Sequence, residues 1–456
     1  MKLYRHLLLF SILLLIHQTI NAQIGKNTGL VSGPMLGFKE HRSVGIWLEV
    51  DGNAKKVSIK YHKKGEAKNT VTKVVSTVAT KDYHPIKIIL ENLEMGSSYQ
   101  YNFEIDGKAV SSTEFSFETK NLWEWRMPAP DFTFMVGSCI YINDSIYDRP
   151  VANGKKPYGM SASIMETMGN TKADFMIWLG DNHYYREADF SSVAGMKYRF
   201  SHDRKIPETQ KLLRAMPNYA IWDDHDFGSN DSHRGYEYRD SSLSLFSRYW
   251  ANNFAGSKDC PGVQSKFSYS DAEFYLMDDR YYRSSEKLIG DDQAYWGTCQ
   301  MNWLKDNLIS SRATFKIICN GNQVLNPNIQ VGECMHEYQK EYTELMNFIT
   351  QNKIEGVIFI TGDRHFSELV KVTPRGGYSI IDYTSSPLTS SPYIPNGNEA
   401  KNNDRVEGSL QTVQNFGLIS IYGKRNERIL KISTRDAQGK ELFTYEVNEK
   451  ELKMGK

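Results

Sequence analysis

The chain has almost no net charge, few cysteines and no internal repeat. Its 456 residues carry 55 Lys and Arg against 54 Asp and Glu, a formal net charge of +1 at pH 7. This balance excludes a polybasic nucleic-acid surface as the main theme, and the hydrophobic content of 40% excludes a largely disordered chain. No repeat or low-complexity tract interrupts the sequence. We therefore expect an ordinary globular protein that is long enough to bury a large core.

Long apolar segments are also scarce. The longest, LLLFSILLLI at 7–16, is too short to span a bilayer. Basic residues precede it and Ala22 follows it, so we expect residues 1–22 to be a cleaved secretory signal. The alternative is an N-terminal membrane anchor, because Ile20 is large for a cleavage site. No cysteine follows the run, so we expect a periplasmic or extracellular protein without a lipid anchor or a transmembrane segment in its mature chain.

The five cysteines are an odd number, so at least one stays unpaired if others form disulfides. Four of them can pair in three ways. Pairing Cys260 with Cys299 and Cys319 with Cys334 would keep both loops local. Cys319 lies on an apolar run, however, and a buried free thiol is the alternative there. Cys139, the fifth cysteine, stands apart from this group.

The region from about 33 to 119 consists of short strand-like runs. Runs such as VGIWLEV, VSIKYHK and YQYNFEIDG are rich in β-branched and aromatic residues, and turn signals such as Asp106-Gly107 separate them. This pattern predicts a small all-β sandwich domain over residues 23–120. The segment LEMGSSYQY at 93–101 resembles the leucine-to-tyrosine corner of fibronectin type III-like or immunoglobulin-like domains.

A Trp- and Pro-rich linker at 121–130 separates this region from residues 131–456, where the rhythm changes. Apolar strand-like runs such as FMIWLG, YAIW and VIFITG now alternate with helix-like segments at 194–215, 241–253, 301–310 and 336–352. The alternation predicts an α/β sandwich in which helices flank the sheets.

Polar residues follow five of these apolar runs, where each predicted strand ends. They are Cys139; Asp181, His183 and Tyr184; Asp223, Asp224, His225 and Asp226; Asn320, Asn322 and Gln323; and Asp363 and His365. Ligands bind outside the carboxyl ends of strands in open α/β sheets, so we expect these side chains to converge on one crevice. Any single Asp in such a place is more often a helix cap. Five polar strand ends together favour a metal centre.

The ordered motifs resemble the calcineurin-like metallophosphoesterases, and among them the PhoD-like alkaline phosphatases. In chain order the matching motifs are Ser138-Cys139, GDxxY ending at Tyr184, the W-D-D-H-D box from Trp222 to Asp226, G-N-Q from Gly321 to Gln323, G-D-x-H from Gly362 to His365, and T-S-S-P from Thr384 to Pro387. The resemblance covers the whole mature chain. It implies a two-sheet metallophosphoesterase sandwich flanked by helices, and a secreted metal-dependent phosphoric ester hydrolase of the alkaline phosphatase type.

The resemblance also implies a dinuclear metal centre bridged by Asp181. Thiolate, phenolate and imidazole ligands favour Fe(III), for which the expected ligands besides Asp181 are Cys139, Tyr184 and His365. The odd cysteine would then be a thiolate held on the metal.

The second ion would be bound by oxygen atoms alone. Besides Asp181, its expected ligands are Asp224, Asp363 and Asn322, a set that suits Ca²⁺, or Mn²⁺ or Mg²⁺, better than Zn²⁺. Related enzymes carry Asn at the position of Asp224 and His at that of Asp363. This departure is the PhoD-like pattern and argues against a di-zinc centre.

Four further side chains are candidates for work at the site. We expect His225 to stabilise the transition state or to protonate the leaving alkoxide, and the alternative is a hydrogen bond to Asp224. Asn230, His183 and Arg199 are candidates for contact with the substrate or the second metal. The alternatives are that Asn230 is a turn residue, that His183 is a solvated loop histidine and that Arg199 is an exposed or structural arginine.

The expected substrates are small phosphate esters. The main alternative is a phosphodiesterase or phospholipase-like enzyme with the same site, acting on nucleotide, teichoic-acid or phospholipid diesters. The balanced charge disfavours a polyanion, so no stable nucleic-acid partner is expected, and the oligomeric state is left open. A non-enzymatic adhesion or carbohydrate-binding protein would not need ligands on five strand ends. A non-haem iron oxygenase would need two histidines, one carboxylate and open positions.

Overall fold

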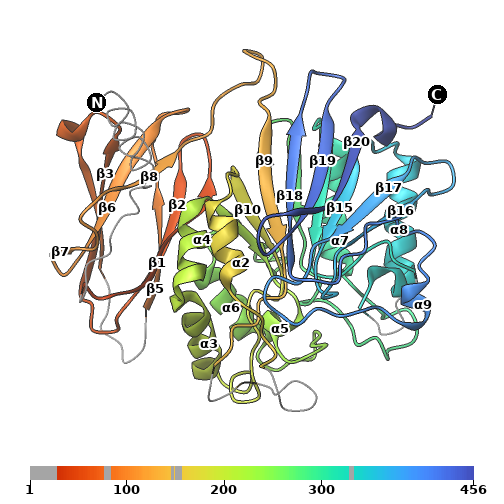
Figure 1. Ribbon diagram of the computed structural model, residues 1–456, viewed down its shortest axis with the longest axis horizontal. Helices are drawn as coiled ribbons and strands as arrows, with labels where there is room; N and C mark the ends of the chain where they lie inside the picture. Colours follow the sequence, from red (N-terminus) through yellow and green to blue (C-terminus); the bar gives the residue numbers. More distant parts are fainter. Residues whose placement is uncertain (1–27, 77–83, 145–147, 149–156, 328–332, 456) are drawn as a thin grey trace, which may run out of the picture. The chain divides into compact units, whose positions relative to one another are not determined.

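The computed structural model describes residues 28–76, 84–144, 148, 157–327 and 333–455 (Figure 1). These residues form two compact units. The smaller unit holds the described residues of 1–30, 51–82 and 97–118, and the larger holds those of 31–50, 83–96 and 119–456. The expected signal segment, 1–22, lies outside the described residues. Within the described part of the chain, no helix has the length and apolar character needed to cross a membrane.

The smaller unit is built on a five-stranded antiparallel sheet. Its elements are β3 (Lys56–Lys63), η1 (Ala67–Asn69), β4 (Val71–Ser76), β6 (Ser98–Ile105), β7 (Lys108–Ala109) and β8 (Phe115–Glu118). Side chains alternate along β6, so Tyr99, Tyr101 and Phe103 are buried on one face. Asp106 and Gly107 both have positive φ, at the turn between β6 and β7 where the sequence predicts one.

A three-stranded sheet in the order β1-β2-β5 lies almost entirely in the larger unit. Its strands are β1 (Leu30–Lys39), β2 (Val44–Val50) and β5 (His84–Leu90). It packs on helix α6 (Arg239–Tyr249), where the Trp47 indole donates a hydrogen bond to the Arg248 carbonyl at 3.0 Å. The region 23–120 therefore contributes strands to both units, and the domain boundary expected at 121–130 stays a prediction.

Two six-stranded sheets form the centre of the larger unit, in the orders β11-β10-β9-β18-β19-β20 and β12-β13-β14-β15-β17-β16. The first contains β9 (Phe132–Gly137), β10 (Phe175–Leu179), β11 (Asn218–Ile221), β18 (Asn415–Tyr422), β19 (Ile429–Asp436) and β20 (Glu441–Asn448). The second contains β12 (Ser265–Tyr269), β13 (Ala272–Leu276), β14 (Phe315–Asn320), β15 (Val357–Thr361), β16 (Glu368–Val372) and β17 (Ile380–Thr384). Strands β9 to β11 are parallel, and so are β13, β14, β15 and β17.

Aromatic side chains fill the space between these two sheets. Phe134 of β9 stacks on Phe175 of β10 with 5.2 Å between ring centroids, and it meets Phe274 of β13 edge-on at 5.1 Å. Helices cover the outer faces (Figure 1). On the first sheet they are α2 (Ser163–Asn170), α3 (Val193–Lys205), α4 (Pro207–Ala215) and α6, and on the second α7 (Gly297–Ser310) and α8 (Gln339–Gln351). The short helices are α5 (Asp224–Phe227), η2 (Met335–Glu337), α9 (Gly397–Ala400) and η3 (Glu449–Leu452).

One expected helix is divided in the structure. The sequence predicts a continuous segment over 194–215, but Ile206 is extended with ψ of 140° and separates α3 from α4. Pro207 explains the break, because proline disfavours a helical residue before it and has no N–H to continue the helix.

Of the disulfide pairings that the sequence leaves open, the structure contains Cys260–Cys299. Cys139, Cys319 and Cys334 are buried free thiols. The second local pairing is therefore absent, and Cys319 follows the alternative of a buried thiol. The Cys334 Sγ instead lies 3.0 Å from the Asn326 carbonyl.

Candidate metal centre

The polar residues predicted at strand ends converge at the carboxyl edges of the two central sheets. Cys139 follows β9, Asp181 follows β10 and Asp224 follows β11, while Asn322 follows β14 and Asp363 follows β15. Parallel strands end at the same edge of a sheet, and the two sheets face each other, so loops from both bring their side chains together. Ligand atoms of Cys139, Asp181, Asp224 and Asp363 do lie in overlapping clusters there.

The backbone is tightly constrained at these strand ends. Cys139, Asp181, Asp363 and His365 have φ of 60°, 49°, 70° and 56°, in the left-handed region that non-glycine residues seldom adopt. Gly180 precedes one of them, and a Cβ placed there would lie 2.7 Å from the Asp223 Cβ. The glycine of the GDxxY motif therefore lets the ends of β10 and β11 approach each other closely.

The first group of candidate ligands combines sulfur, phenol, imidazole and carboxylate. Sγ of Cys139 lies 3.6 Å from Oδ2 of Asp181, and the Tyr184 hydroxyl lies 2.9 Å from both Asp181 Oδ2 and His365 Nε2. Nδ1 of His365 donates to the Ser391 carbonyl at 2.9 Å. A carbonyl only accepts, so Nδ1 carries the proton and Nε2 presents its lone pair to the site.

Burial dominates the protonation of this group. It raises the pKa of the Cys139 thiol and of the Tyr184 phenol well above their ordinary values, and Asp181 adds to both shifts. Burial also lowers the pKa of His365 to about 4, so the imidazole is neutral at physiological pH. A neutral imidazole is ready to bind a metal, whereas the thiol and the phenol need a nearby cation to ionise.

The second group contains only oxygen ligands. One ligand atom from each of Asp181, Asp223 and Asp363 lies within 4.8 Å of the others, and Asp224 joins Asp181 and His225 in an overlapping cluster. Oδ1 of Asp224 and Oδ2 of Asp363 are buried and accept no hydrogen bond in the described part of the structure. Their nearest cations are Arg280, 3.5 Å from Asp224 Oδ1, and Arg364, 3.5 Å from Asp363 Oδ2.

These observations fit a metal centre. Buried carboxylate oxygens without hydrogen bonds are costly unless something binds them, and carboxylates crowded together repel one another. The thiol, phenol and imidazole of the first group suit Fe(III), and the oxygen atoms of the second suit Ca²⁺, Mn²⁺ or Mg²⁺. Asp181 takes part in both groups, as a bridging carboxylate would.

Asn322, an expected ligand of the second ion, is engaged by the protein itself. Its Oδ1 accepts hydrogen bonds from Arg280 at 3.0 Å and from Arg283, and its Nδ2 donates to Asp223 Oδ2 at 2.8 Å. Arg280 also binds the other oxygen of Asp223 at 2.6 Å. The sequence counts Asp223 among the polar residues at strand ends, but no separate role was expected for Arg280 or Arg283. The run Asp278-Asp279-Arg280 after a strand was the signal that could have pointed to them.

Glu333 is a further acidic residue that the sequence reasoning missed. One of its carboxylate oxygens lies within 4.8 Å of ligand atoms of Asp224 and Asp231. It also forms an ion pair with Arg364 at 3.2 Å. No strand-end pattern marks Glu333, because it precedes η2 in a long connection between β14 and α8.

Known families and structures share this architecture. The sequence profile of the PhoD-like phosphatases matches residues 134–429. The chain belongs to the PhoD-like phosphatase family. A second profile, a domain of unknown function (DUF7800), matches residues 27–120. Alkaline phosphatase D of Bacillus subtilis (strain 168) is 21% identical in a 333-residue alignment that covers 62% of this chain and 54% of that protein, so the match spans about half of the curated relative.

Two solved structures support the fold of this PhoD-like chain. The structure of PhoD superposes with a TM-score of 0.75 at 16% identity, over 95% of this chain and 93% of that one. Purple acid phosphatase PPD1 from yellow lupin (Lupinus luteus) seeds gives a TM-score of 0.64 at 11% identity, over 91% and 74% of the two chains. The predicted two-sheet metallophosphoesterase sandwich with an all-β N-terminal region is confirmed, and so is the predicted family. The prediction of a metallophosphatase agrees with this membership.

Of the other predicted site residues in this PhoD-like chain, some lie at the metal centre and others do not. His225 lies at the centre, with its ring centroid 4.1 Å from that of Tyr184 and its Nε2 3.8 Å from Asp224 Oδ2. Its backbone N–H donates to Asp181 Oδ1 at 3.2 Å. Asn230 is exposed, and its amide donates to Asp231. His225 therefore adjoins the second group of ligands, whereas Asn230 contacts Asp231, whose backbone N–H donates to Asp224 Oδ2 at 2.8 Å.

Two candidates for substrate contact are buried instead. His183 is 2% exposed and packs against Phe200 with 4.0 Å between ring centroids, so the alternative of a solvated loop histidine is wrong. Arg199 is fully buried and pairs with Asp189 at 2.8 Å. Its environment is that of the structural arginine which the sequence left as an alternative.

Proposed function

We propose that the chain is a metal-dependent phosphoric ester hydrolase of the alkaline phosphatase type, which releases phosphate through attack by water at a dinuclear centre. The observation that carries this proposal is the pair of ligand groups that share Asp181 at the strand ends of a PhoD-like fold. Iron in the first group and calcium, manganese or magnesium in the second are the cations that the donor atoms favour.

The residues of the site support distinct roles in this reaction. When bound, two cations close together polarise the phosphoryl group and make the attacking water more acidic. Asp181 holds both ligand groups at a fixed separation. His225 is 12% exposed beside Asp224, so its imidazole can reach a substrate and stabilise the transition state or protonate the leaving alkoxide. Tyr184 packs against the His225 ring and thereby limits its orientation.

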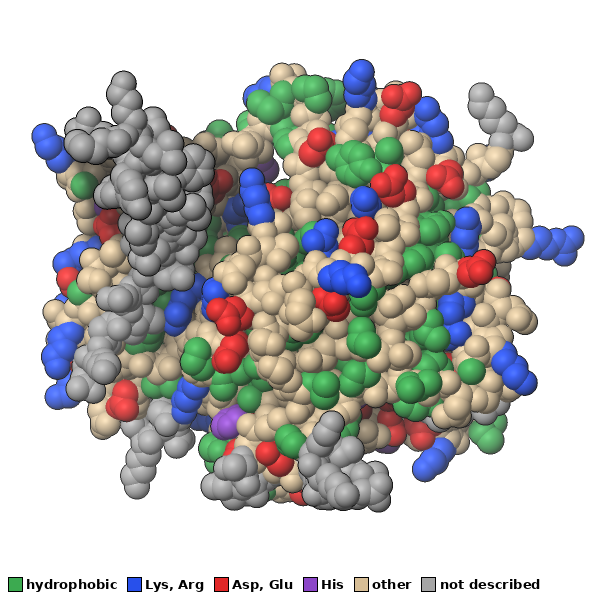
Figure 2. Space-filling model, in the orientation of Figure 1, with side chains coloured by type: hydrophobic (Ala, Val, Ile, Leu, Met, Phe, Trp, Pro, Cys, Tyr) green, Lys and Arg blue, Asp and Glu red, His purple; other side chains and the backbone are tan. Residues whose placement is uncertain are grey.

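Small phosphate esters are the proposed substrates. Lys, Arg, Asp and Glu side chains are interspersed on the face that Figure 2 shows, without one broad patch of Lys and Arg. Such a face offers little attraction to a long polyanion. The signal-like pattern at 1–22 supports export of the protein as part of this proposal.

We predict that purified protein contains iron and a second cation, and that it hydrolyses a nitrophenyl phosphate monoester faster than the corresponding diester. Elemental analysis and paired assays measure both. Thiolate and tyrosinate bound to Fe(III) absorb visible light, so the protein should be coloured. A colourless and fully active enzyme would overturn the iron assignment, and faster hydrolysis of the diester would favour the phosphodiesterase alternative.

The same assay tests Asp181. Asp181→Asn should lower kcat on the order of 10³-fold or more and reduce the metal content, because it removes the charge shared by both ligand groups. Circular dichroism should show an unchanged fold. Glu166→Gln is the matched control, since Glu166 is 55% exposed in a surface ion pair with Lys211, and it should keep full activity. Retained turnover in Asp181→Asn would remove the bridging role.

A further inference from the structure

Arg280 lies beneath the oxygen ligands with its guanidinium fully buried. Its Nε donates to Asp223 Oδ1 at 2.6 Å and its Nη2 donates to Asn322 Oδ1 at 3.0 Å. Nη2 also lies 2.5 Å from Asp223 Oδ1 and 3.5 Å from Asp224 Oδ1. One planar side chain therefore contacts residues from the ends of both β11 and β14.

The contacts of Arg280 give two adjacent carboxylates, those of Asp223 and Asp224, different surroundings. Both oxygens of Asp223 are occupied, one by Arg280 and the other by the Asn322 amide at 2.8 Å. Asp224, the next residue, accepts a hydrogen bond from the Asp231 N–H at Oδ2, while its Oδ1 accepts none in the described structure. Asp223 is thus held by the protein, and Asp224 keeps an oxygen for a ligand.

Asp278 fixes the place of Arg280. Its Oδ1 accepts hydrogen bonds from the backbone N–H of Arg280 at 3.0 Å and from the Trp222 indole at 2.8 Å. Its Oδ2 accepts from the Val263 N–H at 2.9 Å. The Gln300 side chain binds the backbone of Asp278. Its Oε1 accepts from the Asp278 N–H and its Nε2 donates to the Asp278 carbonyl, each at 2.7 Å. Asp278 is fully buried, so water does not compete for these bonds.

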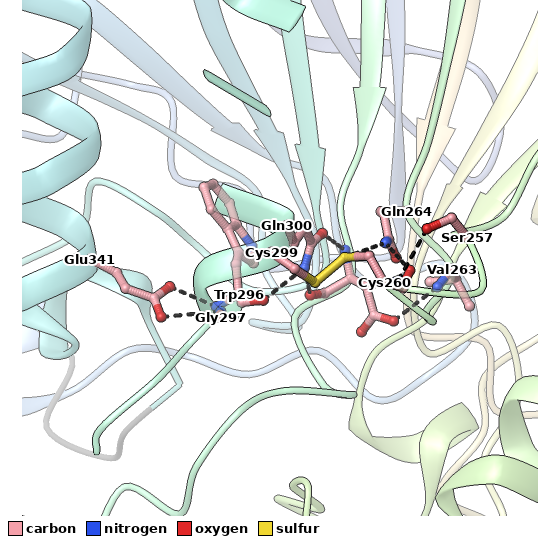
Figure 3. Close-up of a disulfide and its surroundings, with 10 residues drawn as sticks. Ser257, Cys260, Val263, Gln264, Trp296, Gly297, Cys299, Gln300 and Glu341 are labelled. Atoms are coloured by element: carbon pink, nitrogen blue, oxygen red, sulfur yellow. Dashed lines mark hydrogen bonds between the residues drawn. A yellow bond between two sulfur atoms is a disulfide. The ribbon is translucent and has the colours of Figure 1, made fainter. Parts of the chain in front are cut away.

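The Cys260–Cys299 disulfide joins the two segments that hydrogen-bond to Asp278 (Figure 3). Cys299 precedes Gln300 in α7, and Cys260 lies three residues before Val263. The Gln264 amide donates to the Cys260 carbonyl at 2.8 Å and closes the short loop on that side. The covalent bond therefore prevents the Val263 and Gln300 contacts from separating.

We propose that Arg280 is a positioning residue of the oxygen-ligand metal site, and that the Cys260–Cys299 disulfide maintains its position through Asp278. This inference rests on the proposed function. The guanidinium holds Asp223 and Asn322 in one hydrogen-bonded layer, and that layer keeps the adjacent Asp224 in the geometry that a cation requires. Arg280 itself touches neither substrate nor the reacting atoms in this proposal.

The test measures Ca²⁺ binding to the full-length protein by calorimetry after removal of bound metal with a chelator. Arg280→Lys keeps the positive charge but loses the forked geometry, and it should bind Ca²⁺ at least tenfold more weakly. Arg428→Lys is the matched control, because Arg428 is also buried and binds two carboxylates outside the ligand groups. These are Asp131 at 2.6 Å and Asp271 at 3.0 Å. This control variant should lower Tm without changing Ca²⁺ affinity. Wild-type affinity in Arg280→Lys overturns the proposal.

Two milder variants test the supporting contacts. Asp278→Asn removes the charge that binds the backbone N–H of Arg280. The double variant Cys260→Ser/Cys299→Ser removes the disulfide. Both variants should bind Ca²⁺ several-fold more weakly than the wild type. Cys319→Ala, which alters a buried free thiol of β14, is their control and should leave the affinity unchanged. If the double cysteine variant lowers Tm but binds Ca²⁺ like the wild type, the disulfide has no positioning role. A wild-type protein that neither binds Ca²⁺ nor hydrolyses esters would overturn the proposed function instead.

Discussion

The carboxylates of the second ligand group differ in their electrostatic surroundings. Burial raises the pKa of Asp224, but His225 and Arg280 outweigh it and lower the pKa to about 2. Burial raises the pKa of Asp363 to about 6 in spite of Arg364, and burial with neighbouring carboxylates raises that of Asp181 well above its ordinary value. Without a cation, Asp181 and Asp363 therefore hold their protons more firmly, and metal binding must release them.

His225 is the residue on which the proposed chemistry most depends. We predict that His225→Ala lowers kcat by about 10² to 10⁴-fold, the range for loss of a general acid, while the metal content stays unchanged. Steady-state kinetics and elemental analysis of the same preparation measure the two effects. His84→Ala, at the start of β5, is the control and should have wild-type kcat. Metal lost in proportion to activity would instead assign His225 the structural role of holding Asp224.

At the scale of elements, the strand ends of the second sheet are joined by a buried polar cluster. Asp382 of β17 accepts hydrogen bonds from the N–H groups of Val324 and Leu325 at 2.8 and 2.9 Å, and from the Thr361 hydroxyl at 2.8 Å. It thereby ties the chain after β14 to β15 and β17, next to the loops that carry Asn322 and Asp363. Burial raises the pKa of Asp382 to about 6.

This elevated pKa predicts a pH dependence of stability. The folded state retains the Asp382 proton up to about pH 6, whereas the unfolded state loses it near 3.8, so this carboxyl makes the protein less stable as pH rises between these values. Asp382→Asn removes the charge, and its amide oxygen can still accept from the Val324 and Leu325 N–H groups while its amide N–H donates to the Thr361 hydroxyl oxygen. Each pH unit between the two pKa values is worth about 1.4 kcal/mol, so the variant should gain up to about 3 kcal/mol relative to wild type between pH 4 and 7.

Urea unfolding of both proteins at several pH values measures this difference. The pH dependence of the difference between wild type and variant isolates the contribution of position 382. A stability difference that does not change between pH 4 and 7 would contradict the raised pKa of Asp382.

At the scale of the whole molecule, stability of the larger unit depends on the aromatic layer between its two six-stranded sheets. Phe134 is fully buried there and contacts Phe175 in its own sheet and Phe274 in the facing one. Each aromatic side chain in such a layer buries a large apolar area and contributes strongly to the stability of the core.

We predict that Phe134→Ala lowers the free energy of unfolding by about 3–5 kcal/mol, because the neighbouring rings cannot close the cavity. Chemical denaturation followed by tryptophan fluorescence measures the loss. Phe254→Ala is the matched control, since Phe254 is 47% exposed, and it should change stability by less than about 0.5 kcal/mol. A loss below about 1 kcal/mol in Phe134→Ala would show that the layer repacks easily.

The sequence predicted the parallel strands of the larger unit and several of its helices, because these elements leave distinct hydrophobic patterns. The runs ending at Cys139, Asp181 and Asp363 are strands in the structure, and their polar residues lie together. Their roles as metal ligands remain proposals. The break at Pro207 was missed, because the segment 194–215 was expected to be one helix although proline interrupts a helix.

The sequence by itself determined which chemistry-bearing residues stand at strand ends, because that depends on local pattern and on the shared edge of parallel strands. Only the tertiary structure decided that Arg280 holds Asp223 and Asn322, that Arg199 pairs with buried carboxylates and that Cys260 pairs with Cys299. These contacts join residues far apart in the chain. No local pattern encodes them, because they depend on which loops the packing of the sheets and helices brings together.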